Sequence, residues 1–312
     1  HIKLIESDYT ATNATAFGLT GGVAIAQTVP QGGFSNGSLS GAPYVFGVSG
    51  VDLCCSNTTP STLTSAGLFT ADGIGDFTSG FSDTFLQLNC AQQTCKQNEI
   101  TGAQVSGAFT GGYAVDATGR AVSTSITFGT EPRPAYNPTY YFYLTGSAAG
   151  AGEPAALVLA DGDTNYASFA TGVAYQQSGS AALNGDYGMS FTQENGSEND
   201  GTAQFNASGT AQTLAGVADS SVNAGLSGLP DQSIGGTFNS PSANGPFSGT
   251  LENANQSSAF NIGGSGTGLP VNYYFIDAEH NFWIETDLIS ASSGEVSSGY
   301  DVARTPVCAT CP

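Results

Sequence analysis

The chain has 312 residues and a formal net charge of −20, because 25 acidic residues oppose only 5 basic ones. A strongly acidic surface repels phosphates, so nucleic acid and anionic membrane surfaces are poor partners. Hydrophobic residues make up 39% of the sequence, which is enough for a core in one large or two ordinary domains. No apolar run reaches the roughly 18 residues that a membrane-spanning helix needs, so we expect no membrane span.

The first 29 residues stand apart from the rest of the chain. Two short apolar stretches flank a spacer rich in Ser, Thr and Asn. An isolated strand leaves its backbone polar groups without partners. The segment is therefore expected either to pack on its own domain or to add, as a donor strand, to an open sheet edge of a neighbouring subunit. The residues that we assign to this assembly strand are Ile2, Leu4, Ile5, Val23 and Ile25.

Two later parts of the chain repeat one another. A Leu-x-Gly opening followed by alternating apolar residues occurs at 39–48 and again at 183–191. A Phe-x-Ala-x-Gly hairpin follows in each half, at 69–73 and at 205–209. A repeat of roughly 130 residues is far longer than a solenoid unit of about 20–50 residues, so it indicates a duplicated domain.

The periodicity within each half is that of β-strands. Alternate residues are apolar, and turn signals such as Asp72-Gly73 and Asn184-Gly185 separate the runs. We therefore predict an all-β protein with two similar antiparallel β-sandwich or barrel-like domains from an internal duplication. The alternating residues expected on the inner faces are Tyr44, Phe46 and Val48 in the first half and Tyr187, Met189 and Phe191 in the second. The predicted divisions are an N-terminal extension (1–29), a first domain (30–178), a second domain (179–307) and a tail (308–312).

The cysteines indicate an oxidising compartment. Their even number favours disulfides, whereas a zinc site would need regular pair separations and further ligands. Fifteen full pairings are open, and a bond between Cys90 and Cys95 is our first local candidate. The tail pair either closes on itself or tethers the C-terminus to an inserted loop, and the neighbouring pair at 54–55 is expected to bond elsewhere. The six residues are Cys54, Cys55, Cys90, Cys95, Cys308 and Cys311.

Two aromatic clusters, at 140–143 and 273–276, have two interpretations. Strands covered on both faces, by a core and by an interface, explain them without any ligand. An exposed aromatic row could instead stack on sugar rings. We favour the core-and-interface interpretation. The acidic pairs Asp72/Asp76 and Asp161/Asp163 are likewise interpreted as turn formers rather than as calcium ligands, because neither pair has EF-hand spacing.

The stretch from Tyr273 to Asp287, followed by Gly299-Tyr300, carries a resemblance to a known group. Together with the Leu-x-Gly-x-Tyr opening and the hairpin, it resembles the uncharacterised secreted β-repeat domains of acidobacterial-type bacteria. The resemblance covers most of residues 38–307. It implies export and a β fold, and it supplies no catalytic residues.

Few residues could support catalysis. The chain has two histidines, His1 and His280. A Ser-His-Asp arrangement would have only His280 as base, without a Gly-x-Ser-x-Gly elbow between a strand and a helix. The α-amine and imidazole of His1, with His280, could form a copper site that resembles the histidine brace of lytic polysaccharide monooxygenases. The carboxylates of Glu279, Glu285 and Asp287 could pair for glycoside hydrolysis, but we favour their interpretation as acidic residues in surface turns. We therefore assign no catalytic residue, no metal ligand and no cofactor.

The resulting hypothesis is a secreted structural protein, located outside the cell or on its surface. It would self-associate into a homopolymer, an extracellular filament, through β-strand addition. The alternative is a secreted carbohydrate-binding or copper-dependent, polysaccharide-active protein. Glycans are expected partners at Asn-x-Ser/Thr sequons if the source glycosylates exported proteins. The sequons are at Asn13, Asn36, Asn57, Asn195, Asn206 and Asn255.

Overall fold

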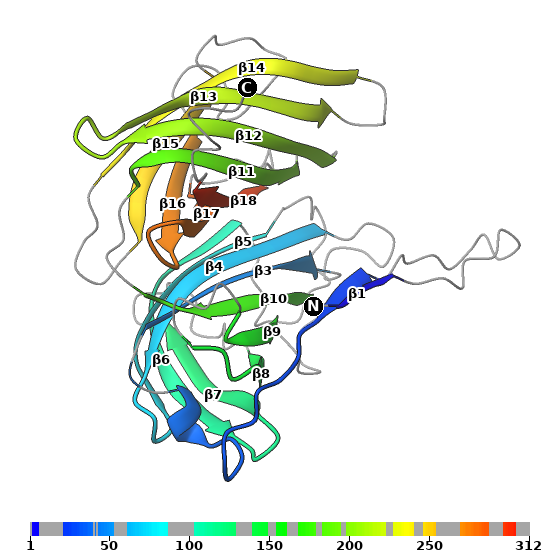
Figure 1. The fold of residues 1–312 in the computed structure, drawn as a ribbon, viewed down its shortest axis with the longest axis vertical. Coiled ribbons are helices and arrows are strands. Elements are labelled where there is room, and N and C mark those ends of the chain that lie inside the picture. The colour runs from blue at the N-terminus through cyan, green and yellow to red at the C-terminus, as the bar shows by residue number, and fades with distance from the viewer. Residues whose placement is uncertain are drawn as a thin grey trace, which may run out of the picture.

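The computed structural model is almost entirely β (Figure 1). It consists of two barrels and a separate two-stranded ribbon. The prediction of an all-β chain with two similar antiparallel domains is confirmed, and both sheets close into barrels. The structure describes residues 2–5, 21–39, 41, 43–52, 61–86, 103–128, 139–148, 154–160, 168–178, 183–194, 198–222, 227–239, 246–253, 269–286 and 296–303.

The first barrel is antiparallel throughout, and its strands follow one another around the wall in chain order. The last strand, β10, pairs with the first, β3, from Gln176↔Tyr44 to Ser168↔Asp52, and this pairing closes the barrel. The strands are β3 (Pro43–Asp52), β4 (Ser61–Ala71), β5 (Asp76–Leu86), β6 (Ala103–Val115), β7 (Arg120–Phe128), β8 (Tyr141–Leu144), β9 (Ala156–Ala160) and β10 (Ser168–Gln176).

The second barrel repeats this arrangement, with β11 and β18 closing the wall. Its strands are β11 (Gly185–Glu194), β12 (Glu198–Ser208), β13 (Thr213–Val222), β14 (Ser227–Phe238), β15 (Phe247–Asn253), β16 (Leu269–Phe275), β17 (His280–Glu285) and β18 (Val296–Ala303). The ribbon consists of β1 (Ile2–Ile5) and β2 (Gly21–Ala24), and a short 3-10 helix, η1 (Asn36–Leu39), precedes the first barrel.

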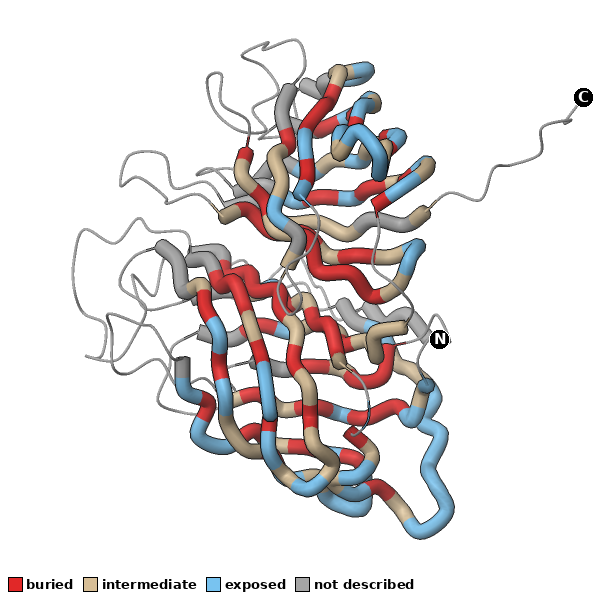
Figure 2. Tube along the Cα trace, turned by 90° about the vertical axis from the view of Figure 1, so that its left-hand side faces the viewer, coloured by how far each residue is buried: buried red, intermediate tan, exposed pale blue. Residues whose placement is uncertain are grey.

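Each barrel has its own aromatic core. The alternating residues that the repeat predicted are buried inside the walls, and buried and exposed residues alternate along the strands (Figure 2). The same stacked pair occurs in both barrels: the rings of Tyr44 and Phe69 lie 5.2 Å apart at 14°, and those of Tyr187 and Phe205 lie 5.3 Å apart at 14°. The duplication has therefore kept the packing of the core as well as the order of the strands.

Glycines in the barrel walls make room for these rings. A Cβ at Gly80 would overlap the ring of Phe109, and a Cβ at Gly201 would overlap the ring of Phe191. Glycine in a strand interior weakens the strand unless a ring or backbone approaches closely there. These two glycines are thus part of the aromatic packing.

The Asp72 turn behaves as the sequence predicted. The Oδ1 atom of Asp72 accepts hydrogen bonds from the backbone nitrogens of Ile74 (2.8 Å), Gly75 (2.9 Å) and Asp76 (2.9 Å). These backbone hydrogen bonds, foremost that from Asp76, hold the pKa of Asp72 below its ordinary value. The carboxylate therefore closes the β4–β5 turn, and the Asp161/Asp163 pair lies outside the described residues.

The aromatic clusters differ between the halves. In β16, Tyr273 and Phe275 enter the core of the second barrel, while Tyr274 is buried against the first barrel, as the core-and-interface interpretation expects. In the first half, Phe142 is in the core, but Tyr143 is 43% exposed. For Tyr143 the core-and-interface interpretation is therefore wrong, because no described element of the second barrel covers this side chain on the outer face of β8.

Candidate functional site: the barrel junction and the N-terminal ribbon

The two barrels meet through the outer faces of their walls. A third apolar cluster joins Val45 and Ala66 of the first barrel to Tyr274, Ile276 and Ile284 of the second. Because Gly47 has no side chain, the ring of Phe282 can lie directly against the wall of the first barrel at this point. A Cβ at Gly47 would lie 2.8 Å from Cδ1 of Phe282. The junction is thus a packed interface.

A buried carboxylate lies within this junction. Asp83 of β5 is fully buried and accepts hydrogen bonds from Ser106 Oγ, from Asn272 Nδ2 at 2.6 Å and from Tyr274 Oη at 2.6 Å. Burial raises the pKa of Asp83 above its ordinary value, although the three hydrogen bonds oppose this shift. Burial also raises the pKa of Tyr274, and the charge of Asp83 adds to the effect. Asp83 therefore links the first barrel to β16 of the second.

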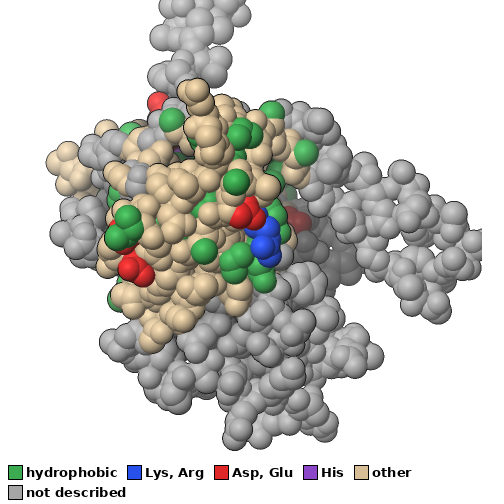
Figure 3. Space-filling model, turned by 90° about the horizontal axis from the view of Figure 1, so that it is seen from below, with side chains coloured by type: hydrophobic (Ala, Val, Ile, Leu, Met, Phe, Trp, Pro, Cys, Tyr) green, Lys and Arg blue, Asp and Glu red, His purple; other side chains and the backbone are tan. Residues whose placement is uncertain are grey.

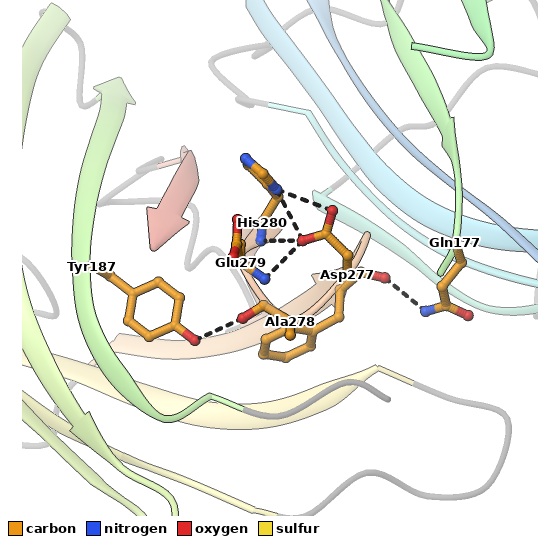
Figure 4. A network of polar contacts seen from close by, with 7 residues as sticks. Gln177, Tyr187, Asp277, Ala278, Glu279 and His280 are labelled. Carbon is orange, nitrogen blue, oxygen red and sulfur yellow. Dashed lines mark hydrogen bonds and ion pairs between the residues drawn. The ribbon is translucent and has the colours of Figure 1, made fainter. Parts of the chain in front are cut away.

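The turn between β16 and β17 holds the connection between the barrels (Figure 4). Gln177, just after β10, donates from Nε2 to the Phe275 carbonyl at 2.7 Å, and the Ser178 nitrogen donates to the Ile276 carbonyl at 2.9 Å. Within the second barrel, Tyr187 Oη donates to the Ala278 carbonyl at 3.2 Å. Hydrogen bonds from the segment after β10 and from Tyr187 of the second barrel therefore hold this turn.

The same turn contains His280, which the sequence suggested as a possible copper ligand together with His1. The Oδ1 atom of Asp277 accepts from the backbone nitrogens of Glu279 (2.7 Å) and His280 (2.8 Å), and it lies 2.9 Å from Nδ1 of His280. The imidazole also stacks on Tyr300, with ring centroids 6.2 Å apart. His1 lies outside the described residues. In the described part of the chain, no three His, Cys, Asp or Glu residues lie close enough together to hold a metal ion.

The N-terminal ribbon belongs to neither barrel (Figure 1). Its strands β1 and β2 are antiparallel, with Ile2 opposite Ala24 and Ile5 opposite Gly21. Val23 of the predicted assembly strand is 40% exposed. The chain after the ribbon is bound to the first barrel, because Gln27 Nε2 donates to the carbonyl of Leu144 at 2.7 Å. The residues assigned to the assembly strand therefore lie in or next to one ribbon.

A groove of about 500 Å³ lies between the barrels. Strands β3, β4 and β10 line it from the first barrel, and β11, β12, β17 and β18 from the second. Its polar side chains are hydroxyls and one carboxylate, that of Asp200. The aromatic residues Phe282 and Tyr300 also line it. The hydroxyl residues lining it are Ser49, Thr64, Ser65, Thr171, Ser190, Thr192 and Ser298. No sequence pattern indicated this groove, because its residues come from distant strands.

Two of the six sequons lie in the described part of the chain. The Asn36 amide is already engaged, since Nδ2 donates to the Ile74 carbonyl at 2.9 Å and Oδ1 accepts from the Val115 nitrogen at 2.8 Å. A glycan there would replace one of the two Nδ2 hydrogens, directly beside the contact with Ile74. Asn206 is exposed and donates only to Asp186, at 2.9 Å, among the contacts described. The other sequons and all six cysteines lie outside the described residues, so the disulfides stay a prediction.

The described surface agrees with the composition. Seen from below, one face shows mainly uncharged polar and backbone atoms with scattered apolar and few charged side chains (Figure 3). No helix among the described residues has the length and hydrophobicity needed to cross a membrane.

Comparisons with known proteins give no family. No protein-family model matches the chain, and no curated protein matches it. A similar solved structure is a Nitrosomonas europaea protein provisionally named AttH, with 9% identity and a TM-score of 0.27. The alignment covers 89% of this chain and 97% of that protein.

Proposed function

We propose that the protein is an extracellular structural subunit that assembles into a homopolymer by β-strand addition. The observation that carries the proposal is the β1–β2 ribbon outside both barrels. A two-stranded sheet is marginal in water, and no third strand among the described residues pairs with either of its edges. A strand from another subunit would satisfy one of these edges.

The composition supports an extracellular location. Six cysteines suit an oxidising compartment, and a charged fraction of 10% is low for a cytoplasmic helical protein. Two packed barrels with a fixed junction form a rigid unit, which suits a structural role.

Electron microscopy and light scattering on the purified protein test the assembly. Full-length protein is expected to form polymers, and a variant that lacks residues 1–29 is expected to remain monomeric. A synthetic peptide of residues 1–9 in excess should shorten the polymers by occupying acceptor edges, whereas a scrambled peptide should not. Polymers of equal length from the truncated variant would contradict strand addition, and monomers from the full-length protein would contradict the homopolymer.

A further inference from the structure

The groove between the barrels has an ordered lining. On the first barrel, Thr171, Ser49 and Thr64 are neighbours across three adjacent strands, through the pairs Thr171↔Ser49 and Ser49↔Thr64. These residues form a row of hydroxyls. Ser49 and Thr171 are exposed, whereas Thr64 is buried at the inner end of the row.

A second row faces the first from the other barrel. Asp200, Thr192 and Ser298 are neighbours through the pairs Thr192↔Asp200 and Thr192↔Ser298. The rows meet at one end, where Thr64 Oγ1 donates to Ser298 Oγ at 3.1 Å. Asp200 and Thr192 are exposed, and they are bonded to each other at 3.0 Å. The groove thus has two polar walls that converge.

Aromatic side chains and glycines complete the lining. Phe282 and Tyr300 lie with ring centroids 5.2 Å apart, and both are only partly buried. Gly47 and Gly172 add backbone without side chains. A space of about 500 Å³ is within the range of small-molecule sites, roughly 300–1,000 Å³.

The chemistry of the lining selects among ligand classes. None of the described lining residues is cationic, and Asp200 is acidic, so an anionic ligand is disfavoured. One carboxylate is too few for a calcium ion, which takes 6–8 oxygen ligands. Hydroxyls both donate and accept, and therefore match other hydroxyls, while the weakly positive C–H groups of a sugar ring can pack on the faces of aromatic rings.

We propose that the groove between the barrels binds a neutral saccharide. The two hydroxyl rows and Asp200 would hydrogen-bond the sugar hydroxyls, and Phe282 and Tyr300 would pack against a ring face. This proposal does not depend on strand addition, because the groove is formed within one chain.

Fluorescence titration tests the proposal with the full-length protein. Trp283 is the single tryptophan of the chain and follows Phe282 in the wall of the groove, but its ring lies in the barrel core, so its emission reports occupancy only indirectly. Calorimetric titration of the same probes is therefore run beside it and decides whether a probe binds. The probes are cellohexaose, maltohexaose and chitohexaose, with hexagalacturonate as the anionic comparison. We expect saturable binding of at least one neutral probe and at least tenfold weaker binding of hexagalacturonate. Absence of binding by all three neutral probes, or tighter binding of hexagalacturonate, would overturn the proposal.

Matched variants locate the site. Thr192→Val and Ser49→Val each remove one exposed hydroxyl from a groove wall and should weaken binding about five- to tenfold, as expected for one hydrogen bond. Thr110→Val, which removes an exposed hydroxyl of β6 outside the groove, should leave binding unchanged. Calorimetric titration of the same variants gives the affinities without relying on Trp283. Equal affinities for all three variants would place the binding elsewhere and refute the assignment.

Discussion

Replacing Trp283 with alanine is expected to lower the free energy of unfolding by about 4 kcal/mol. Trp283 is 1% exposed in the core of the second barrel, with its ring 6.5 Å from that of Phe191. The barrel wall is rigid, so the space left by the indole cannot close fully. The measurement is urea unfolding followed by circular dichroism.

Trp283→Phe is the matched control for this prediction. Indole Nε1 is buried without a hydrogen-bond partner among the described residues, so removing its N–H relieves a cost while most of the ring volume is kept. The loss of stability should therefore be clearly smaller than for Trp283→Ala. An alanine variant within about 1 kcal/mol of the native protein would show that the core repacks around the site.

Replacing Asp83 with alanine is expected to cost about 3 kcal/mol, because three buried donors lose their common acceptor. Asp83→Asn keeps the shape and one acceptor oxygen, although its NH₂ group faces a donor, so it should cost less than alanine. Both losses are read from urea unfolding at pH 7.5. An alanine variant as stable as the native protein would show that water replaces the carboxylate.

The same carboxylate predicts a pH dependence with a definite sign. The pKa of Asp83 is raised in the folded protein from its ordinary 3.8, so folding favours the protonated form. The contribution of Asp83 to stability is then greatest below about pH 3.8 and is lost as pH rises through the raised pKa. The pKa of Asp72 is lowered, so its contribution to stability has the opposite sign and is lost as the pH falls through that lowered pKa.

Unfolding free energies measured between pH 4 and 7.5 isolate the contribution of Asp83. The native protein should lose more stability across this range than Asp83→Asn, which has no group to titrate at this position. Identical slopes for the two proteins would contradict the raised pKa.

The sequence predicted the barrels better than the junction. Alternation placed Tyr44 and Tyr187 on inner faces, and the repeat paired Phe69 with Phe205, because these patterns follow from local periodicity. The choice between sandwich and barrel stayed open, since the pairing of β10 with β3 depends on strand curvature across the whole sheet.

The polar part of the junction had no sequence signal. Asp83 lies between Ser82 and Thr84 in an ordinary strand, and its partner Asn272 is 189 positions away. Only the two aromatic clusters suggested an interface, and the structure has one at the second of them, where Tyr274 and Ile276 are buried against the first barrel.

The apolar patch on the outside of the first barrel also has a consequence for biosynthesis. This barrel leaves the ribosome first, and Val45, Ala66 and Phe81 stay exposed to water until β16 and β17 have been translated. During that interval the nascent chain exposes an apolar, aggregation-prone surface on a first barrel that has already folded. Translation speed through the second half, and chaperones that shield the patch, therefore control how many chains aggregate before their barrels join.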